Sequence, residues 1–372
     1  MTALAILVCL PAVFALAMTV FNLVMWPRGN AGRAMPDVAV LIPARDEERG
    51  IERAVQSALR SGATQVAVYD DGSTDATPRI LEDLAAGADN LTIVAGGELP
   101  PGWVGKPHAC HRLAQHTRAD TLLFMDADVE LADGALERMQ SLFDRFDADA
   151  VTVVPRQVLG STFERLVMPL LHVTYTSWLP LPLIWRSRDP RFLAANGQVL
   201  AVRRAVYEAT GGFEAVRDAV VDDMALCRKL KQTGHRVVFG DGHRIASCRM
   251  YAGASEVWRG FSKNIYEGLG SSVALLGAIA LYLWAFVAPW AALALAFFWP
   301  SVLPAAIVGV AANIAQRILH AVRHEQPLWG AVTHPLAVLV LVGVALNSWF
   351  WHARSRIDWK GRSYSRIEER RT

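Results

Sequence analysis

The sequence predicts an α/β domain flanked by apolar segments that are long enough to cross a membrane. Strand patterns alternate with helical patterns between residues 37 and 252, which is typical of a mostly parallel sheet with helices on both faces. Residues 1–27 and most of 269–352 are apolar instead. Only 19% of the 372 residues are charged, below the roughly one quarter that is usual in a soluble domain, and the two apolar regions account for this deficit.

The N-terminal segment, residues 1–27, is predicted to be a transmembrane anchor. It carries no charged side chain, and at about 1.5 Å per helical residue its apolar run exceeds the roughly 30 Å hydrocarbon core of a bilayer. A cleaved signal peptide is the alternative, because Ala15-Leu16-Ala17 resembles a cleavage site, but no Lys or Arg precedes the run and the run continues past that site. Arg28 and Arg33 follow the run, so we expect the next domain on the cytoplasmic side.

The α/β domain, residues 37–252, begins with a buried-strand pattern at 38–43 and a helical pattern at 51–59. The later elements are expected, in chain order, as a strand at 65–69, a helix at 76–84, a strand at 91–94, a helix from Pro107, and strands at 121–125 and 150–154. Acidic turns follow two of the strands, at Asp70–Asp75 and Asp126–Asp128. Because ligands of such sheets bind at the carboxyl ends of the strands, we expect the functional site at these turns.

Each acidic turn also has a purely structural interpretation. Asp70–Asp75 is compatible with a helix start that uses Asp75 as the N-cap, a position that favours Asp and Ser, and a lone Asp-x-Asp sequence is common. The functional alternative is that Asp126 and Asp128, two residues apart at a strand end, hold one hard cation. Mg²⁺ or Mn²⁺ bound by few protein oxygens would leave coordination positions open for phosphate oxygens.

Taken in order along the chain, the motifs are more specific than any one of them. The motifs are Ile42-Pro43-Ala44-Arg45-Asp46-Glu47-Glu48, Asp70-Asp71-Gly72-Ser73-Thr74-Asp75, Asp126-Ala127-Asp128 and Asp222-Asp223. Over residues 38–240 the chain therefore resembles the family 2 glycosyltransferases of the GT-A fold, a nucleotide-diphospho-sugar transferase fold related to the Rossmann fold. The segments 102–106, 249–251, 260–264 and 359–364, together with the membrane segments, are similar to those of hopanoid-associated and carotenoid glycosyltransferases.

The resemblance implies a nucleotide-diphosphate sugar as the donor, most simply a UDP-sugar, and Mg²⁺ or Mn²⁺ as the cofactor. It implies that the donor pocket is formed by Pro43, Arg45, Glu47, Asp70, Asp71, Lys106 and Asp126. Within it, Asp70 and Asp71 would contact the uridine, while Asp126 and Asp128 would hold the metal on the diphosphate. Lys106 would be a second clamp on the diphosphate, against the alternative of a solvated surface lysine. Asp46 stands where the family often has Asn, and the sequence assigns it no role.

The acceptor side rests on later residues. By resemblance Asp223, next to Asp222, is the general base, although acids at a helix start are also favoured by the helix dipole alone. Asn196 and Gln198 stand where the family's acceptor-side loop is expected. Arg249 and Lys263 lie on the stretch that leads into the C-terminal membrane region. They are candidates for binding the diphosphate or, alternatively, anionic lipid headgroups.

Residues 166–185 form an uncharged stretch inside the α/β domain. A membrane crossing here would put Asp126 and Asp223 on opposite sides of the bilayer, and Pro169 and Pro180 argue against one continuous helix. We expect an interfacial element that faces the lipid acceptor, with Trp residues at headgroup depth. The alternative is a helix packed on the sheet.

The C-terminal part is expected to comprise an interfacial segment at 253–268, a membrane region of two to three helices at 269–352 and a basic cytoplasmic tail at 353–372. Pro300 and Pro304 mark a turn, and 317–334 is expected to be a loop. Three full crossings would leave the basic tail outside, against the positive-inside tendency, so one segment of this region is expected to be re-entrant or interfacial. The sequence thus predicts a multi-pass protein, in a bacterial inner membrane, with its catalytic domain in the cytoplasm.

The expected activity is inverting transfer of a single sugar to a membrane-lipid hydroxyl, such as that of a hopanoid or carotenoid. A polysaccharide synthase is disfavoured because its Gln-x-x-Arg-Trp motif is absent, Trp258-Arg259 having the reverse order, and because the helices are few for a channel. A non-catalytic nucleotide-binding scaffold is disfavoured because Asp71, Asp128 and Asp223 are all present. Nucleic acid is excluded as a partner by the net charge of +2 and the lack of a basic stripe.

Overall fold

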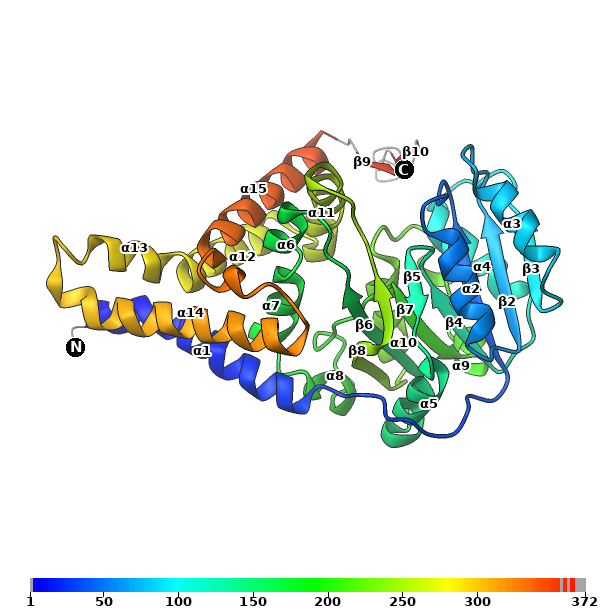
Figure 1. The fold of residues 1–372 in the computed structure, drawn as a ribbon, viewed down its shortest axis with the longest axis horizontal. Helices are drawn as coiled ribbons and strands as arrows, with labels where there is room; N and C mark the ends of the chain where they lie inside the picture. Colours follow the sequence, from blue (N-terminus) through cyan, green and yellow to red (C-terminus); the bar gives the residue numbers. More distant parts are fainter. Residues whose placement is uncertain (1–2, 355–356, 360–361, 365–372) are drawn as a thin grey trace. The chain divides into compact units, whose positions relative to one another are not determined.

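The computed structural model describes residues 3–354, 357–359 and 362–364 (Figure 1). Most of the basic tail predicted at 353–372, including residues 360–361 of the 359–364 segment, therefore lies outside the described residues. The chain forms two compact units. The α/β unit consists of Trp26–Val158 and Pro182–Met250, and the helical unit draws on Met1–Met25, Leu159–Leu181 and Tyr251–Thr372.

The α/β unit is built on one mixed sheet with the strand order β3-β2-β1-β4-β7-β6-β8-β5. The strands are β1 Val38–Ala44, β2 Gln65–Asp70, β3 Leu91–Ala95, β4 Thr121–Met125, β5 Val129–Leu131, β6 Ala150–Gln157, β7 Val199–Arg203 and β8 Val237–Cys248. The first four strands in this order are parallel, as are β6 and β8. β7 runs antiparallel to both β4 and β6, and β5 runs antiparallel to β8. The α/β class is confirmed, but the sheet is more mixed than expected, because an apolar run such as that of β7 carries no information on strand direction.

Helices cover both faces of this sheet, as predicted (Figure 1). They are α2 Ile51–Arg60, α3 Thr77–Ala85, α4 Gly105–Gln115, α5 Ala135–Phe146, α8 Pro182–Arg186, α9 Arg204–Ala209 and α10 Asp222–Gln232. Successive side chains of a strand point to opposite faces: Val40 and Ile42 of β1 join the core beneath α2 and α5, whereas Leu41 joins the core beneath α4 and α10. The central strands are therefore buried on both faces of the sheet. This packing holds the strand ends, where the candidate site lies, in fixed positions.

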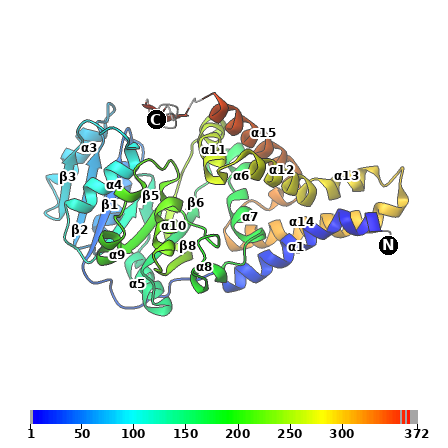
Figure 2. The same ribbon diagram turned by 180° about the vertical axis from the view of Figure 1, so that it is seen from behind.

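Within the described residues, three helices of the helical unit are long and apolar enough to cross a membrane: Ile6–Met25, Pro300–Arg323 and His334–Ala353. The bent pair Ala254–Leu269 and Ser272–Phe286 would be a fourth if it formed one span. The elements of this unit are α1 Ala3–Met25, α6 Thr162–Val167, α7 Leu170–Ser177, α11 Ala254–Leu269, α12 Ser272–Phe286, α13 Ala288–Leu295, α14 Leu303–Arg323, α15 His334–Ala353 and the short strands β9 Ile357–Trp359 and β10 Arg362–Tyr364. α1 and α14 lie side by side in both views (Figures 1 and 2). α11 and α12 meet at a bend of 114°.

The segment 166–185 does not form one helix. α7 ends at Ser177 and α8 begins at Pro182, as the prolines predicted. The residues of this stretch up to Leu181 belong to the helical unit, where Asn22 of α1 donates hydrogen bonds of 2.8 Å to the carbonyls of Thr176 and Leu179. The predicted domain 37–252 is thus interrupted by Leu159–Leu181, because two separated pieces of sequence complete the sheet.

The long apolar block is divided more finely than the sequence indicated. α12 is followed by the short α13, which spans eight residues and is too short to cross a bilayer. The turn predicted at Pro300 and Pro304 lies between α13 and α14: Pro300 begins the short 3₁₀ helix Pro300–Val302, and Pro304 lies in the first turn of α14. α14 continues to Arg323, so residues 317–323 are helical rather than loop. A re-entrant segment among these helices stays a prediction.

Candidate active site

The loops after β1 and β2 are held together by acidic side chains. Asp46 has a positive φ of 51°, a conformation in which Asn and Asp are enriched, and its Oδ1 accepts a hydrogen bond of 2.7 Å from the Thr74 amide. Asp75 Oδ2 accepts from the Glu48 amide at 3.0 Å and its Oδ1 from the Thr77 amide at 2.9 Å. The structure thus gives Asp46 a task that the sequence could not: it ties the two loops together.

Asp70 and Asp71 differ in their surroundings. Asp70 Oδ1 accepts hydrogen bonds from the amide and the hydroxyl of Ser73, at 3.0 and 2.6 Å, and so shapes its own turn. Asp71 is buried, and its Oδ2 lies 3.8 Å from Nη1 of Arg45, which also donates to the Asp71 carbonyl. Arg45 therefore orients Asp71. Uridine contacts by Asp70 and Asp71 stay predictions.

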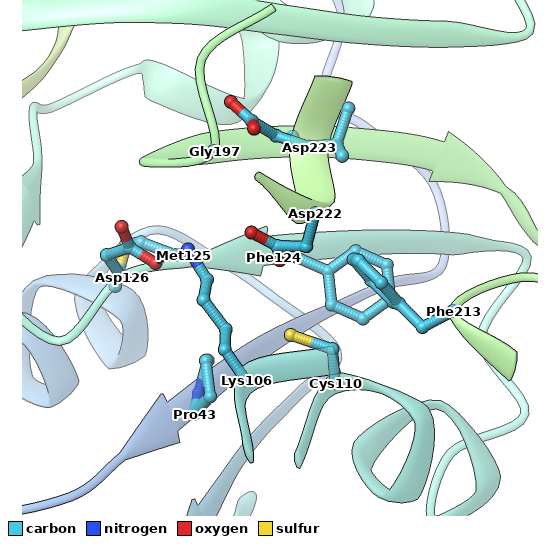
Figure 3. Close-up of a pocket in the computed structure, with 11 residues that line it drawn as sticks. Pro43, Lys106, Cys110, Phe124, Met125, Asp126, Gly197, Phe213, Asp222 and Asp223 are labelled. Carbon is cyan, nitrogen blue, oxygen red and sulfur yellow. Dashed lines mark ion pairs between the residues drawn. The ribbon is translucent and has the colours of Figure 1, made fainter. Parts of the chain in front are cut away.

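A pocket opens at the carboxyl ends of β1 and β4 (Figure 3). Its lining residues are Pro43, Lys106, Cys110, Phe124, Met125, Asp126, Gly197, Leu200, Phe213, Asp222 and Asp223. Lys106 extends from α4 toward Asp126, and its Nζ lies 2.6 Å from Oδ1 of that carboxylate. Burial by itself would lower the pKa of Lys106, but the carboxylates of Asp126 and Asp222 raise it well above its usual value. Lys106 is therefore a charged group inside the pocket rather than a solvated surface lysine.

Asp222 and Asp223 occupy the first turn of α10. Asp223 accepts a hydrogen bond of 2.8 Å at Oδ1 from the Met224 amide. Burial and the neighbouring Asp222 carboxylate raise the pKa of Asp223 to about 6. A carboxylate with a raised pKa is a stronger base once it is ionised, which suits the role expected of Asp223.

Gly197 is a site residue that the sequence analysis did not single out. A Cβ at this position would lie 3.1 Å from Cβ of Asp223 and 3.3 Å from Nζ of Lys106. The backbone can therefore approach both side chains only because residue 197 has none. Its place between two predicted site residues, Asn196 and Gln198, is the sequence feature from which Gly197 could have been predicted as a site residue.

Asp128 is the residue best suited to a cation. Its Oδ1 is buried and has no hydrogen-bond partner within the described part of the chain, and burial together with the carboxylates of Asp126 and Glu47 raises the pKa of Asp128 to about 7. A buried carboxylate oxygen that has no hydrogen-bond donor is stabilised by a cation. Among the described residues no three His, Cys, Asp or Glu side chains are placed to hold a metal by themselves, so Mg²⁺ or Mn²⁺ here would need further oxygen ligands, such as those of a diphosphate.

Asn196 and Gln198 are buried and engaged within the protein. The Asn196 side chain accepts from the Gln198 amide at 2.9 Å. The Gln198 carbonyl accepts from the Asp126 amide at 3.1 Å, which fixes the residue that directly follows β4. Gln198 Nε2 also donates to Sγ of Cys248 at 2.8 Å, and Cys248 is hydrogen-bonded to Asp128. These contacts position the Asp126–Asp128 turn, whereas acceptor contacts by Asn196 and Gln198 stay predictions.

Arg249 and Lys263 belong to different units. Arg249 follows β8 near the end of the α/β unit, and Lys263 lies on α11 of the helical unit. Contacts of either residue with a diphosphate or with lipid headgroups stay predictions.

Comparisons with known proteins identify relatives of this chain. A family model described as "Glycosyltransferase like family 2" matches residues 36–261. The chain is 26% identical over 351 residues to a 4,4'-diaponeurosporenoate glycosyltransferase of Staphylococcus haemolyticus, covering 92% of each chain. It is 24% identical over 340 residues to the protein of the same name from Staphylococcus aureus, covering 89% of each.

One solved structure supports the fold. A mannosyltransferase from Pyrobaculum calidifontis, solved in complex with GDP-mannose and Mn²⁺, superposes with a TM-score of 0.55 at 19% identity. The match covers 91% of this chain and 99% of that one. At this identity the similarity establishes a common GT-A fold.

Proposed function

The chain belongs to glycosyltransferase family 2, and from this premise we propose that it transfers a single sugar from a nucleoside-diphosphate sugar, preferably a UDP-sugar, to a membrane-lipid hydroxyl. A hopanoid or a carotenoid is the preferred acceptor. The observation that carries the proposal is that Lys106, Asp126 and the Asp222–Asp223 pair line one pocket. A cationic side chain, a candidate metal ligand and a candidate base are the groups that this transfer needs.

The donor side requires that charge on the departing diphosphate be neutralised. When bound, Mg²⁺ or Mn²⁺ at Asp126 and Asp128 supplies positive charge to the diphosphate oxygens. Lys106 supplies a second positive charge from α4, and its ion pair with Asp126 keeps that charge in place before the donor arrives. Asp71, oriented by Arg45, is assigned to the nucleotide.

The acceptor side requires a base. Asp223 takes the proton of the acceptor hydroxyl while that oxygen attacks the anomeric carbon and the bond from this carbon to the diphosphate breaks. Attack on the face opposite the leaving group inverts the configuration. Asp222 assists by raising the pKa of Asp223, which makes the ionised carboxylate a better proton acceptor.

A carboxylic-acid lipid is the second candidate acceptor. It is suggested by the relatives that are named for 4,4'-diaponeurosporenoate. A carboxylate is already ionised near neutral pH and needs no base, so the buried acid pair favours the hydroxyl acceptor. The two acceptor classes should respond differently to loss of Asp223.

We place the protein in the membrane on the strength of three helices with suitable length and composition. We assign the α/β unit to the cytoplasmic side, where nucleotide sugars are made, in agreement with the arginines that follow α1. A polysaccharide synthase stays the less favoured alternative.

The test uses membranes that contain the protein, a panel of labelled UDP-sugars, Mg²⁺ or Mn²⁺, and a total lipid extract. Metal-dependent label in the organic phase that is absent with Asp223→Asn supports a lipid-hydroxyl transferase, and mass spectrometry then identifies the acceptor. Label that persists in Asp223→Asn with a carboxylic-acid lipid favours the second candidate. Label found only in water-soluble polymer would replace the proposal with the synthase.

A further inference from the structure

α14 carries a buried polar face, although it is among the helices apolar enough to span a membrane. Four of its residues, spaced as one face of a helix, are at most 2% exposed: Asn313, Gln316, Arg317 and His320. Polar side chains within a membrane helix are costly unless they face the protein interior and find partners there. The partners of these four therefore decide what the face does.

Two of the four are hydrogen-bonded to neighbouring helices, although Oε1 of Gln316 has no partner among the described residues. Gln316 Nε2 donates to the hydroxyls of Thr19 and Ser177, both at 2.8 Å. His320 Nε2 is hydrogen-bonded to the hydroxyl of Thr176 at 2.9 Å. These bonds join α14 to α1 and α7, and interhelical stabilisation explains them fully.

Arg317 is not satisfied in this way. Its side chain is 2% exposed, and it forms no ion pair with any Asp or Glu in the described part of the chain. Its Nε donates to the carbonyl of Gly330 at 3.4 Å, but Nη1 has no hydrogen-bond partner among the described residues. A Cβ at Gly330 would lie 2.8 Å from Nη2, so a glycine is needed where the guanidinium ends.

Two further buried groups lack partners near Arg317. Asn313 lies one turn before it on the same face, and neither of its side-chain amide atoms is hydrogen-bonded within the described residues. His334, at the start of α15, is fully buried, interacts electrostatically with Arg317, and likewise has two ring nitrogens without partners in that part of the chain. Polar atoms of α14 and α15, among them the Asn313 amide nitrogen and one ring N–H of His334, are therefore left without partners near one uncompensated positive charge.

An anion is the partner that such a cluster lacks. A buried charge without a counter-charge is strongly unfavourable, and a guanidinium binds a carboxylate or phosphate through paired N–H donors. Asn313 and His334 add neutral donors of the kind that complete an anion site. The surrounding helices are apolar, so an anion attached to a lipid reaches this position more readily than one from water.

We propose that Arg317, with Asn313 and His334, binds the carboxylate or phosphate of an anionic lipid inside the helical unit. This site is separate from the pocket of the α/β unit and does not depend on the proposed transferase activity. In it the lipid anion replaces the missing acidic side chain, and the lipid tail lies among apolar helices.

The test measures lipid binding to full-length protein that has been purified in detergent and stripped of lipid. Thermal unfolding and native mass spectrometry are recorded with phosphatidylglycerol, oleate, uncharged phosphatidylcholine or inorganic phosphate. We expect phosphatidylglycerol or oleate to raise the melting temperature of the wild-type protein by several degrees and to remain bound in the gas phase. Arg317→Gln should lose both effects, whereas Arg165→Gln, which removes an exposed cation of the same unit, should keep them.

Other outcomes overturn the proposal. Equal stabilisation by phosphatidylcholine would show that the charge is not recognised. Stabilisation by inorganic phosphate alone would show that the anion comes from water and not from a lipid. If Arg317→Gln does not fold, Asn313→Leu keeps the charge and removes only a neutral donor, and unchanged anionic-lipid binding by that variant would overturn the proposed site, of which Asn313 is a part.

Discussion

Nζ of Lys106 lies 2.6 Å from Oδ1 of Asp126, so a cation of the chain itself is paired with a candidate metal ligand. A metal ion bound at Oδ1 of Asp126 would compete with Lys106 for this oxygen. In the proposed site the diphosphate would offer Lys106 a new partner and so leave the carboxylate to the metal. Binding of metal and nucleotide is therefore expected to be cooperative, each favouring the other.

Replacing Lys106 by Met separates these effects. Without the ammonium group, Asp126 is free for a cation, so Mn²⁺ should bind the nucleotide-free protein more tightly than it binds the wild type. Turnover should fall by about 10²-fold, since one charge that stabilises the leaving group is lost. Mn²⁺ binding followed by electron paramagnetic resonance, together with initial rates, checks both expectations. Weaker Mn²⁺ binding in the variant would show that the ion pair does not restrain Asp126.

Asp128 can be tested by Asp128→Asn, which keeps the shape of the side chain and removes its charge. We expect Mn²⁺ affinity to fall at least tenfold and metal-dependent transfer to be lost. The reason is that Oδ1 of Asp128, which is buried and has no hydrogen-bond donor among the described residues, loses its negative charge in this variant. The matched control is Glu130→Gln, two residues after Asp128, which removes an exposed ion pair with Arg53. This variant should bind Mn²⁺ normally. Calorimetric titration of both variants gives the comparison, and normal affinity in Asp128→Asn would exclude it as a ligand.

The sequence predicted where the candidate site lies better than it predicted the contacts that each site residue makes. Asp126 and Asp223 reach one pocket because strand ends and helix starts share an edge of the sheet, and this rule needs only the order of elements. Packing between segments that are distant in the sequence decides whether a side chain points into the pocket or hydrogen-bonds to other residues of the protein. Gln198 is an example: its hydrogen bond to Cys248, far away in the sequence, could not be predicted from the residues around it.

The same limit applies to the larger architecture. Apolar runs located β1, β2 and β4 correctly, but they could not show that β7 is antiparallel. Nor could composition show that Leu159–Leu181 belongs with the helical unit, since an uncharged segment packs equally well on a sheet or on helices.

Asp223→Asn should lower transfer to a hydroxyl acceptor by about 10²- to 10⁴-fold, the range expected for a lost general base, while donor binding is nearly unchanged. The variant should also be more stable than the wild type at pH 8. The pKa of Asp223 is raised on folding, so its ionised form opposes folding most strongly above about pH 6, and this cost disappears below about pH 4, where the group is protonated in both states. Melting temperatures at pH 8 and pH 4 check the difference, and lower stability at pH 8 would mean that lost activity reflects misfolding.

The pH dependence of transfer follows from the same group. A base must be ionised to accept a proton, and the pKa of Asp223 is raised to about 6, so kcat/KM with a hydroxyl acceptor should rise as the pH increases through about 6 and then level off. A profile that is flat from pH 5 to pH 8 would exclude a base with this pKa. The carboxylic-acid acceptor provides the control, since its transfer needs no base and should lack this limb.

Gly197→Ala tests whether the spacing around the catalytic groups matters. The new methyl group would lie 3.1 Å from Cβ of Asp223 and 3.3 Å from Nζ of Lys106, both closer than ordinary van der Waals contact, so the two side chains have to move by a few tenths of an ångström. Misplacement of reacting groups lowers the rate much more than it lowers stability, and we expect kcat to fall at least tenfold with little change in melting temperature. The matched control is Gly62→Ala, at a glycine with no atom near the added methyl group but with a φ of 83°, which should lower stability and leave kcat unchanged. Equal loss of kcat in both variants would mean that the effect of Gly197→Ala comes from the backbone and not from the pocket.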